Sequence, residues 1–371
     1  QWFADYSDFS FHDENGIPYI HFLDGINLTC SNRNGSFIIF NTLGKYWIFN
    51  NKWEGNNGTI DWKERGFSSD SIFANLSSYS IDIRKSEFKA DSVIFYNIKL
   101  FNDPIIGEIS NKTTSGTSDN NYPFFKSYRK DIVINNIVPD VDYKGGYTLR
   151  GSEFIADGRG NASAKIIIKK GEDKILIANS SRFSIKNNTI YSAAAAIRIY
   201  FDDDSIYHPS LQFTYNQFDR KLKLYRDKKG VAGSPIYNSY HQITIDVELL
   251  EWKIDEDMIY LGSLPVTSVS EVNFESLASY DERMYESLRG IDKENPLMLV
   301  SRFISTSGKT EFTSAEFALF AGYPNIQIQH YLMNLANKGF LFYNSSQNKA
   351  IVQDKLYHYI NARLKLESVL V

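Results

Sequence analysis

Residues 78–97 read SYSIDIRKSEFKADSVIFYN, and the order of side chains in this stretch decides the fold class. Over residues 79–84 apolar side chains alternate strictly with polar ones, and a second apolar run follows at 93–96 after a short polar turn. Alternation with a period of two places one face of an extended strand in a core and the other in water. The stretch therefore predicts two short strands joined by a turn.

The same alternation recurs along most of the chain. Apolar residues occupy every second position over 195–201 and again over 243–249, and Gly, Asn, Asp and Ser separate such stretches, as at 56–58. These residue types favour turns, and the spacing of three and four residues that is typical of helices is nearly absent before Pro265. Residues 1–265 are therefore predicted to form one mainly β region.

A faint internal repeat makes this prediction more specific. In residues 79–96 the triplet YSI, a polar turn and the run VIFY follow one another, and residues 183–200 repeat this order with FSI and IRIY. A pair of short strands cannot bury its apolar face alone, whereas stacked pairs share a continuous core. We therefore expect a β-solenoid or a repeated half-roll (jellyroll), with a large β-sandwich as the alternative.

Several stretches together carry a family resemblance. They are the run 44–66 with Trp53, Gly55, Gly58, Asp61, Trp62 and Gly66, the run 78–97, DDDSIYHPS at 202–210, and YNSYHQITIDVELLEW at 237–252. Over most of its length the chain resembles the large, mostly uncharacterised β-repeat proteins of bacterial envelopes. The unit 79–96 also resembles, more loosely, the strand pair of the OstA-like β-jellyroll of lipopolysaccharide transport. The resemblance implies a β-repeat fold and a periplasmic or other envelope location, with the cytoplasm still open, and it implies no catalytic residues.

Residues 266–371 show a different, helical pattern. Helices are expected over 281–290, from Pro296, over 313–322, over 324–338 and from Asp354. Short apolar runs before and after the polar turn 344–348 indicate two strands. Helix, helix, strand, turn, strand, helix is the order of a winged helix-turn-helix, which this region is predicted to resemble.

A winged helix that reads nucleic acid needs cations for the phosphates and polar side chains for the base edges. The helix expected over 324–338 has Asn325, Gln327 and His330, but its single cation, Lys338, lies at its end. Residues 281–371 hold ten basic and nine acidic side chains, a balance that attracts a polyanion weakly. Nucleic acid is therefore kept only as an alternative partner.

Composition limits the class of protein. The 371 residues are 43% apolar and 23% charged, with a formal net charge of −4, and such values are typical of a folded soluble chain. This charge gives no electrostatic reason to expect a polyanion or an anionic membrane as the main partner. Nowhere do about 18 apolar residues follow one another, so no transmembrane helix is predicted.

The beginning of the chain and its cysteine give two further expectations. Gln1 replaces an initiating methionine, and the residues after it do not resemble a signal peptide. We therefore expect a piece of a longer polypeptide, whose other segments, or other envelope proteins, are the expected partners. The single Cys30 has no internal disulfide partner and no nearby histidine, so a buried or inert thiol is expected.

The three aspartates at 202–204 are the first candidate for chemistry. They follow an alternating strand, so Asp203 is expected on its inward face and Asp202 and Asp204 on the other. An acidic run after an apolar strand is typical of a solvated turn, and it lacks the spaced oxygen ligands of a calcium loop. We expect a turn, with a Ca²⁺ site as the alternative.

His208 and His241 are the second candidate, because each follows a tyrosine in a serine-rich context. Two histidines and an aspartate can hold zinc, yet no closely spaced histidine pair is present. Isolated histidines are more often hydrogen-bonded structural residues, so no metal and no cofactor are expected.

Trp47, Trp53 and Trp62 are the third candidate, since they lie close together in the sequence. Exposed aromatic rings stack on the apolar faces of sugars, whereas buried rings fill a core. The core interpretation is favoured, and the three rings remain weak candidates for a ligand surface.

These observations favour a non-enzymatic structural or binding segment of a large bacterial envelope protein. Such a segment presents a β surface to a glycan, a lipid or a protein. The first alternative is a polysaccharide lyase or glycoside hydrolase on a β-solenoid, with an acid pair such as Asp202 and Asp204 facing a groove. The second is nucleic-acid binding through the C-terminal region.

Overall fold

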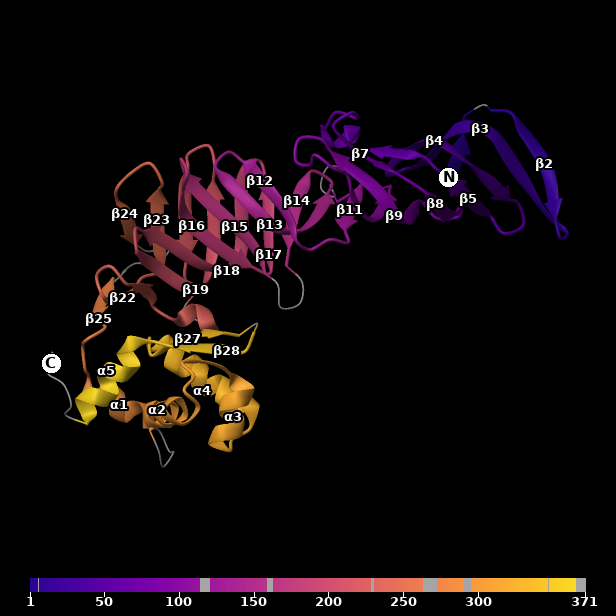
Figure 1. The fold of residues 1–371 in the computed structure, drawn as a ribbon. Helices are drawn as coiled ribbons and strands as arrows, with labels where there is room; N and C mark the ends of the chain where they lie inside the picture. The colour runs from indigo at the N-terminus through magenta and orange to yellow at the C-terminus, as the bar shows by residue number, and fades with distance from the viewer. Residues whose placement is uncertain are drawn as a thin grey trace. The chain divides into compact units, whose positions relative to one another are not determined.

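The computed structural model describes residues 1–5, 7–113, 121–158, 163–227, 230–262, 272–289, 295–345 and 347–364. Strands make up 55% of the chain and helices 17%, with the α-helices close to the C-terminus (Figure 1). The mainly β fold predicted from the alternation is therefore confirmed. The predicted boundary between residues 265 and 266 lies outside the described residues.

The chain divides into two compact units. The first comprises residues 1–164 and 182–187, and the second comprises residues 165–181 and 188–371. The division falls inside the predicted β region, so the compact units do not coincide with the predicted parts 1–265 and 266–371. The reason is that strand pairing between distant residues, which alternation does not reveal, decides where one compact unit ends.

The first unit consists of antiparallel strands and one short 3-10 helix. They are β1 (Trp2–Ala4), β2 (Phe9–Glu14), β3 (Ile17–Asn32), β4 (Gly35–Trp47), β5 (Lys52–Asn56), β6 (Thr59–Asp61), η1 (Lys63–Arg65), β7 (Ile72–Asn75), β8 (Ser78–Asp82), β9 (Glu87–Asn97), β10 (Ile105–Lys112), β11 (Phe124–Ser127), β12 (Ile132–Val138), β13 (Val141–Arg150), β14 (Glu153–Asp157) and β17 (Arg182–Lys186).

Two long strands organise the beginning of this unit. β3 and β4 pair along most of their length, with register shifts between Phe22 and Leu28. The last part of β4 pairs with β5, whereas Phe40 in its middle pairs with β6. On its other edge β5 pairs with β8, and β6 likewise pairs with β7. β4 therefore pairs along one edge with two strands, β5 and β6, each of which begins a separate ladder.

An aromatic column fills the interior of the first unit. Trp62 packs edge-on against Phe95 at 5.3 Å between ring centroids, and Phe95 stacks on Phe125 at 4.1 Å. Tyr147 stacks on Phe154 at 4.8 Å, and all five side chains are buried. Rings of this size supply much apolar area to a core, which explains why a chain rich in aromatics and poor in methionine packs in this way.

The second unit begins with strands of the same kind. They are β15 (Ala164–Lys170, all but its first residue), β16 (Asp173–Ser180), β18 (Thr189–Phe201), β19 (Asp204–Asn216), β20 (Lys221–Tyr225), η2 (Gly230–Gly233), β21 (Ile236–Asn238), β22 (Ile243–Asp246), β23 (Leu249–Lys253), β24 (Ile259–Gly262) and β25 (Asn273–Ser276). The alternating stretch 243–249 contains the whole of β22 and the first residue of β23, so it is not a single strand.

One pattern of strand pairing recurs through both units. β19 pairs with both β20 and β21, β20 also pairs with β23, and β21 also pairs with β22. In the same way β4 pairs with both β5 and β6, β5 also pairs with β8, and β6 also pairs with β7. Between these copies, β14–β17 and β16–β18 repeat the pairs β5–β8 and β7–β9. The sequence repeat between 79–96 and 183–200 coincides with β8–β9 and β17–β18, each a short strand followed by a long one. The same arrangement of paired strands therefore occurs more than once in the β region.

The helical region closes the second unit. Its elements are α1 (Glu282–Arg289), α2 (Pro296–Ser307), β26 (Glu311–Thr313), α3 (Ser314–Ala321), α4 (Asn325–Asn337), β27 (Leu341–Asn344), β28 (Lys349–Val352) and α5 (Asp354–Arg363). Asn295 caps α2, and Thr313 forms a capping box with Glu316 at the start of α3. The helices lie where the sequence predicted them, whereas β26, which joins β28 and β27 in a small sheet, was not predicted. No described helix is long and apolar enough to cross a bilayer.

Candidate functional site

The three aspartates lie in the tight turn between β18 and β19, where Phe201 pairs with Asp204. Asp202 and Asp203 are exposed, and Asp202 takes a left-handed backbone conformation with φ of 51°. Asp203 therefore does not follow the inward face of the strand as expected, because the chain reverses before it. The Asp204 carboxylate accepts a hydrogen bond from the Ser239 hydroxyl at 2.8 Å. This placement is the solvated turn that the sequence favoured.

His208 and His241 differ sharply in surroundings. His208 is 1% exposed, its Nδ1 accepts a hydrogen bond from the Ser210 amide at 3.0 Å, and its Nε2 donates to the Ser234 carbonyl at 2.8 Å. Burial lowers the pKa of His208 to about 3. His241 is exposed and packs edge-on against Tyr240. With both His208 nitrogens engaged, the two histidines do not form a zinc pair, and the described residues contain no group of three potential metal ligands.

The tryptophans and the cysteine lie mainly in the core of the first unit. Trp53 and Trp62 are 1% and 0% exposed, so neither presents a ring face to a ligand. Trp47 is half-buried and packs against Tyr19 at 4.9 Å between centroids. Cys30 is buried and unpaired, and burial raises the pKa of its thiol above the ordinary value. An inert thiol was expected at this position.

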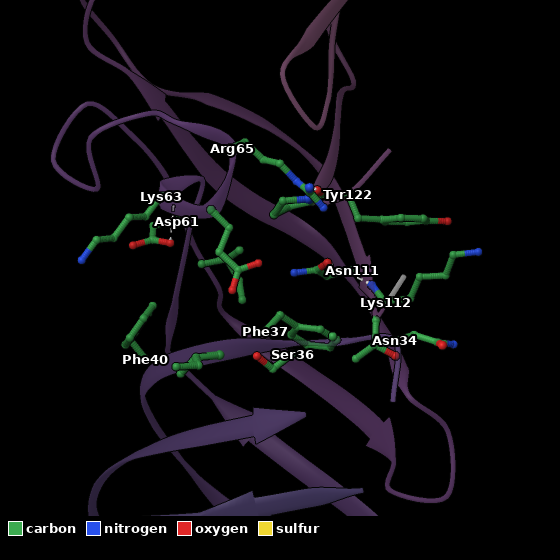
Figure 2. A pocket seen from close by; sticks show the side chains of 16 residues that line it. Asn34, Ser36, Phe37, Phe40, Asp61, Lys63, Arg65, Asn111, Lys112 and Tyr122 are labelled. Carbon is green, nitrogen blue, oxygen red and sulfur yellow. Dashed lines mark hydrogen bonds between the residues drawn. The ribbon is translucent and has the colours of Figure 1, made fainter. Parts of the chain in front are cut away.

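A hollow of about 670 Å³ in the first unit gathers polar and aromatic side chains from segments that are distant in the sequence (Figure 2). The middle of β4 supplies Phe40, the end of β6 supplies Asp61, and η1 supplies Lys63 and Arg65. The end of β10 and the segment before β11 complete the lining with Asn111, Lys112 and Tyr122. The hollow therefore combines ring faces, hydrogen-bond donors and carboxylates.

The turn at 61–66 is held in place from several sides. The Asp61 carboxylate accepts hydrogen bonds from the Ser69 hydroxyl at 2.5 Å and from the Lys63 amide at 3.3 Å. The Arg65 Nε donates to the Tyr122 carbonyl at 2.5 Å, which ties η1 to the opposite wall. Gly66 ends η1 with φ of 85°, a conformation that favours glycine. These contacts fix the backbone of the turn and the Arg65 guanidinium beside the hollow, whereas the exposed Lys63 side chain points away from its middle (Figure 2).

On the opposite wall of the hollow, hydrogen-bond donors lie beside an aromatic ring. The Lys112 ammonium lies 5.1 Å from the centroid of the Tyr122 ring. Asn111 is 4% exposed, its Oδ1 accepts from the Lys112 amide at 3.0 Å, and Figure 2 shows its amide nitrogen pointing toward the middle of the hollow. Phe40, which is 36% exposed, offers an apolar face on the other side. A ligand with both apolar faces and hydroxyl groups fits such a lining.

Sequence reasoning missed most of this hollow. Asp61 belongs to the stretch that carried the resemblance, but nothing local links it with Asn111, Lys112 or Tyr122. The grouping follows from the pairing of β4 with β6 and of β9 with β10, which brings those segments together. The only local indication was Lys63-Glu64-Arg65, a charged run directly after the buried Trp62.

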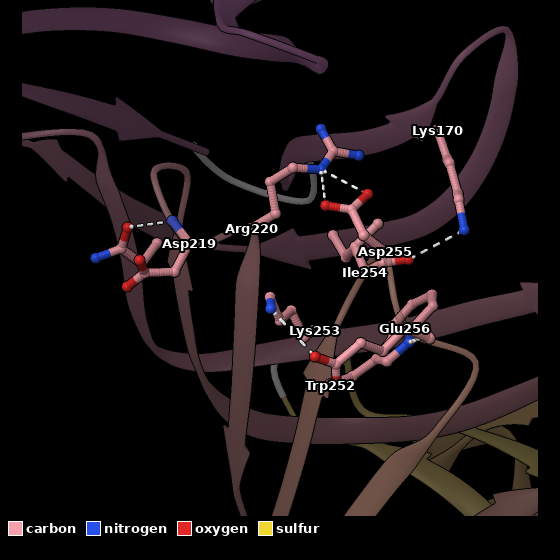
Figure 3. A network of polar contacts seen from close by, with 9 residues as sticks. Lys170, Asp219, Arg220, Trp252, Lys253, Ile254, Asp255 and Glu256 are labelled. Atoms are coloured by element: carbon pink, nitrogen blue, oxygen red, sulfur yellow. Dashed lines mark hydrogen bonds and ion pairs between the residues drawn. The ribbon is translucent and has the colours of Figure 1, made fainter.

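A second polar cluster joins turns at one end of the second unit (Figure 3). Arg220 forms an ion pair with Asp255 at 3.1 Å, and the Lys170 ammonium donates to the Ile254 carbonyl at 3.3 Å. The Trp252 indole N–H donates to the Glu256 carbonyl at 3.0 Å. Because these groups satisfy one another, the cluster is best explained as a fastening of the turns and not as a ligand site.

Comparison with known proteins adds no relative. No family model, no curated protein and no solved structure matches the chain.

Proposed function

We propose that the chain is a non-enzymatic β-repeat scaffold segment of a larger bacterial envelope protein, of the solenoid or repeated half-roll type. The observation that carries this proposal is the recurrence of one strand-pairing pattern, from β4–β8 to β19–β23. Repeats of this kind stack into an extended surface on which ligands or partners bind. The proposed periplasmic or other envelope location is based on the resemblance of the sequence to envelope β-repeat proteins.

We further propose that the hollow in the first unit binds a glycan. Sugar rings present apolar C–H faces that pack on aromatic rings, and Phe40 and Tyr122 offer such rings. Sugar hydroxyl groups both donate and accept hydrogen bonds, which matches the carboxylate of Asp61 and the amide donor of Asn111. A lipid chain would form no hydrogen bond with the buried Asn111 amide or the half-buried Asp61 carboxylate, and displacing water from them without replacement costs free energy.

Titration calorimetry with a panel of neutral and acidic oligosaccharides tests the glycan proposal. Replacing Phe40→Ala removes a stacking face worth about 1.4 kcal/mol, so the Kd of the best ligand should rise about tenfold. Phe218→Ala removes a ring that is 76% exposed in the second unit, and it should leave the Kd within about twofold. Equal effects of the two substitutions, or no binding of any oligosaccharide, would contradict the proposal.

The same panel tests the lyase or hydrolase alternative. Asp61 and Glu64 both line the hollow, so two carboxylates are within reach of a bound sugar. In the scaffold proposal the oligosaccharide remains intact after prolonged incubation, because the Asp61 carboxylate is held by the Ser69 hydroxyl and the Lys63 amide. Cleavage of the oligosaccharide that chromatography detects, and that Glu64→Gln abolishes, would contradict the scaffold proposal and support the enzyme.

The helical region is proposed to be a winged-helix fold used for packing. Several of its cations are engaged by neighbouring carboxylates, with Lys309 on Glu316 at 2.6 Å and Arg363 on Glu282 at 3.1 Å. A phosphate backbone would have to compete with these ion pairs, which lowers the gain from binding. Unchanged mobility of duplex DNA at low salt is the expected result.

A further inference from the structure

The outer edge of β2 lacks a neighbouring strand among the residues that the structure describes. β2 pairs with β3, and Figure 1 shows it as the outer strand of that hairpin. The equivalent strands elsewhere in the repeat, β8, β17 and β23, each pair on their far side with β5, β14 and β20 respectively. β2 therefore occupies a position that is paired in these three copies, whereas β12, which precedes the long strand β13 in the same way, pairs with β13 alone among the described residues.

The sequence supports this equivalence. Phe9-Ser10-Phe11 precedes a turn and the long strand β3, as Tyr79-Ser80-Ile81 precedes β9 and Phe183-Ser184-Ile185 precedes β18. This third copy of the triplet extends the repeat that the sequence showed between 79–96 and 183–200. Three strands of matching sequence and matching position indicate one structural role.

Burial separates β2 from its counterparts. Tyr79 and Ile81 in β8 are 8% and 2% exposed, whereas Phe9 and Phe11 in β2 are 52% and 69% exposed. In β17 the corresponding Phe183 and Ile185 are also buried. Exposed aromatic side chains on an open strand edge, without the lysine or proline that usually protects such an edge, are typical of a partner site.

Charge narrows the chemistry of the partner. Residues 1–32 contain no lysine or arginine, and their carboxylates are Asp5, Asp8, Asp13, Glu14 and Asp24. Along β2 and the residue before it, Asp8 and Glu14 project from the face opposite Phe9 and Phe11, whereas Asp13 shares the aromatic face beside the turn. Glu14 also lies 3.7 Å from the Lys45 ammonium of β4. A second copy paired edge to edge would bring these carboxylates together, which disfavours self-association.

The pair β20–β23 shows what a fitting strand looks like. Lys221 and Lys223 of β20 both contact Glu251 of β23, at 2.7 and 2.9 Å. On the other face Leu222 lies opposite Trp252 and Leu224 opposite Leu250. A strand that alternates lysine with leucine therefore satisfies an acidic and an apolar face at the same time.

We propose that the open edge of β2 binds, by strand addition, a strand of another β-repeat segment that alternates Lys or Arg with apolar side chains. This inference rests on the proposed scaffold function, and it identifies the kind of strand that would extend the sheet of the scaffold beyond β2. The added strand would cover Phe9 and Phe11 with its apolar face and place its cations beside Asp8 and Glu14.

The test uses a labelled peptide with the sequence of residues 219–225, DRKLKLY, and the complete chain. The peptide should bind, as measured by fluorescence anisotropy, and should slow amide hydrogen exchange of residues 9–14 at least tenfold at saturation. A peptide with both lysines replaced by glutamate should bind at least tenfold more weakly. The double variant Asp8→Lys, Glu14→Lys should invert this order of the two peptides.

The double variant Asp203→Lys, Asp257→Lys is the matched control, because it makes the same charge change at two exposed positions of the second unit. With this control variant, as with the native chain, the lysine peptide should bind more tightly than the glutamate peptide. Equal binding of both peptides, exchange that slows elsewhere than in 9–14, or a concentration-dependent dimer formed through β2 would overturn the proposal. Glycan binding measured on the same preparation tests the scaffold's ligand site separately, so either proposal can fail alone.

Discussion

Two titratable side chains, His208 and Arg226, are enclosed in the second unit and share one acceptor. The Arg226 guanidinium is 3% exposed and donates to the carbonyls of Gly233 and Ser234 at 3.0 and 3.1 Å. His208 donates to the same Ser234 carbonyl, and the nearby Arg226 charge adds to burial in lowering its pKa. This arrangement keeps the imidazole neutral and makes it a structural residue.

Replacing His208→Gln should weaken the dependence of stability on acid. The native pKa of about 3 lies below the value of about 6.5 expected in the unfolded chain, so the unfolded state binds more protons between these values. Below about pH 6.5 the native chain should therefore lose up to about 1.4 kcal/mol of stability per pH unit through this residue. Urea unfolding between pH 4 and 8 measures the slope; identical slopes for the native chain and the variant would refute the assignment.

Residue types alone did not show that His208 is buried. In β19 the parity of buried positions changes, because Ile206 and His208 face inward and so do Leu211 and Phe213. A register shift opposite Ala195 and Ile197 accounts for this change, since a bulge moves the following residues to the other face. Alternation predicts strands well, but it does not predict where a bulge reverses the faces.

At the scale of elements, glycines set how closely neighbouring strands and rings approach. Gly44 of β4 lies opposite Gly55 of β5, and the ring of Trp53 covers both positions. A Cβ atom at Gly55 would lie 2.3 Å from the Tyr79 ring and 2.6 Å from the Trp53 ring. Bare backbone in a strand thus makes room for the large rings of the core.

Gly55→Ala should destabilise the chain by about 1–3 kcal/mol, because the added methyl group forces buried rings out of their places. Gly262→Ala in β24 is the matched control, since nothing lies within 4 Å of its added Cβ. It should change the free energy of unfolding by less than about 0.5 kcal/mol. Chemical denaturation followed by tryptophan fluorescence compares the two, and a similar loss in both would show that crowding at Gly55 is unimportant.

At the scale of the whole molecule, local order was predictable and long-range order was not. Alternation identified the strands, and the triplets YSI and FSI marked one repeat, because both depend on near neighbours. The branching of β4 and β19 into two ladders depends on pairing between distant strands, for which the sequence contains no local mark. The candidate hollow depends on that branching, so it could not be predicted.

The helical region is fastened to the sheet of the second unit by one buried cation. Lys355 at the start of α5 is 1% exposed, pairs with Glu275 of β25 at 2.8 Å and donates to the Lys338 carbonyl at 3.0 Å. Burial lowers the pKa of Lys355, and the Glu275 carboxylate counteracts that effect. Phe342 of β27 adds an apolar contact by packing on Tyr207 at 4.5 Å between centroids.

Glu275→Gln should destabilise the second unit by about 1–3 kcal/mol at neutral pH, because it leaves the Lys355 charge buried without a counter-ion. This loss is below that of a fully enclosed pair, since the Glu275 side chain is 36% exposed. The loss should shrink in alkaline solution, because burial lowers the pKa of Lys355 and the buried amine gives up its proton more readily than an ordinary lysine. Lys355→Met should cost less than Glu275→Gln, because water can solvate the remaining carboxylate, and adding Lys355→Met to Glu275→Gln should restore most of the stability. Calorimetric unfolding of the variants decides the matter: losses in the two single variants that simply add in the double variant would mean that this pair does not couple the helices to the sheet.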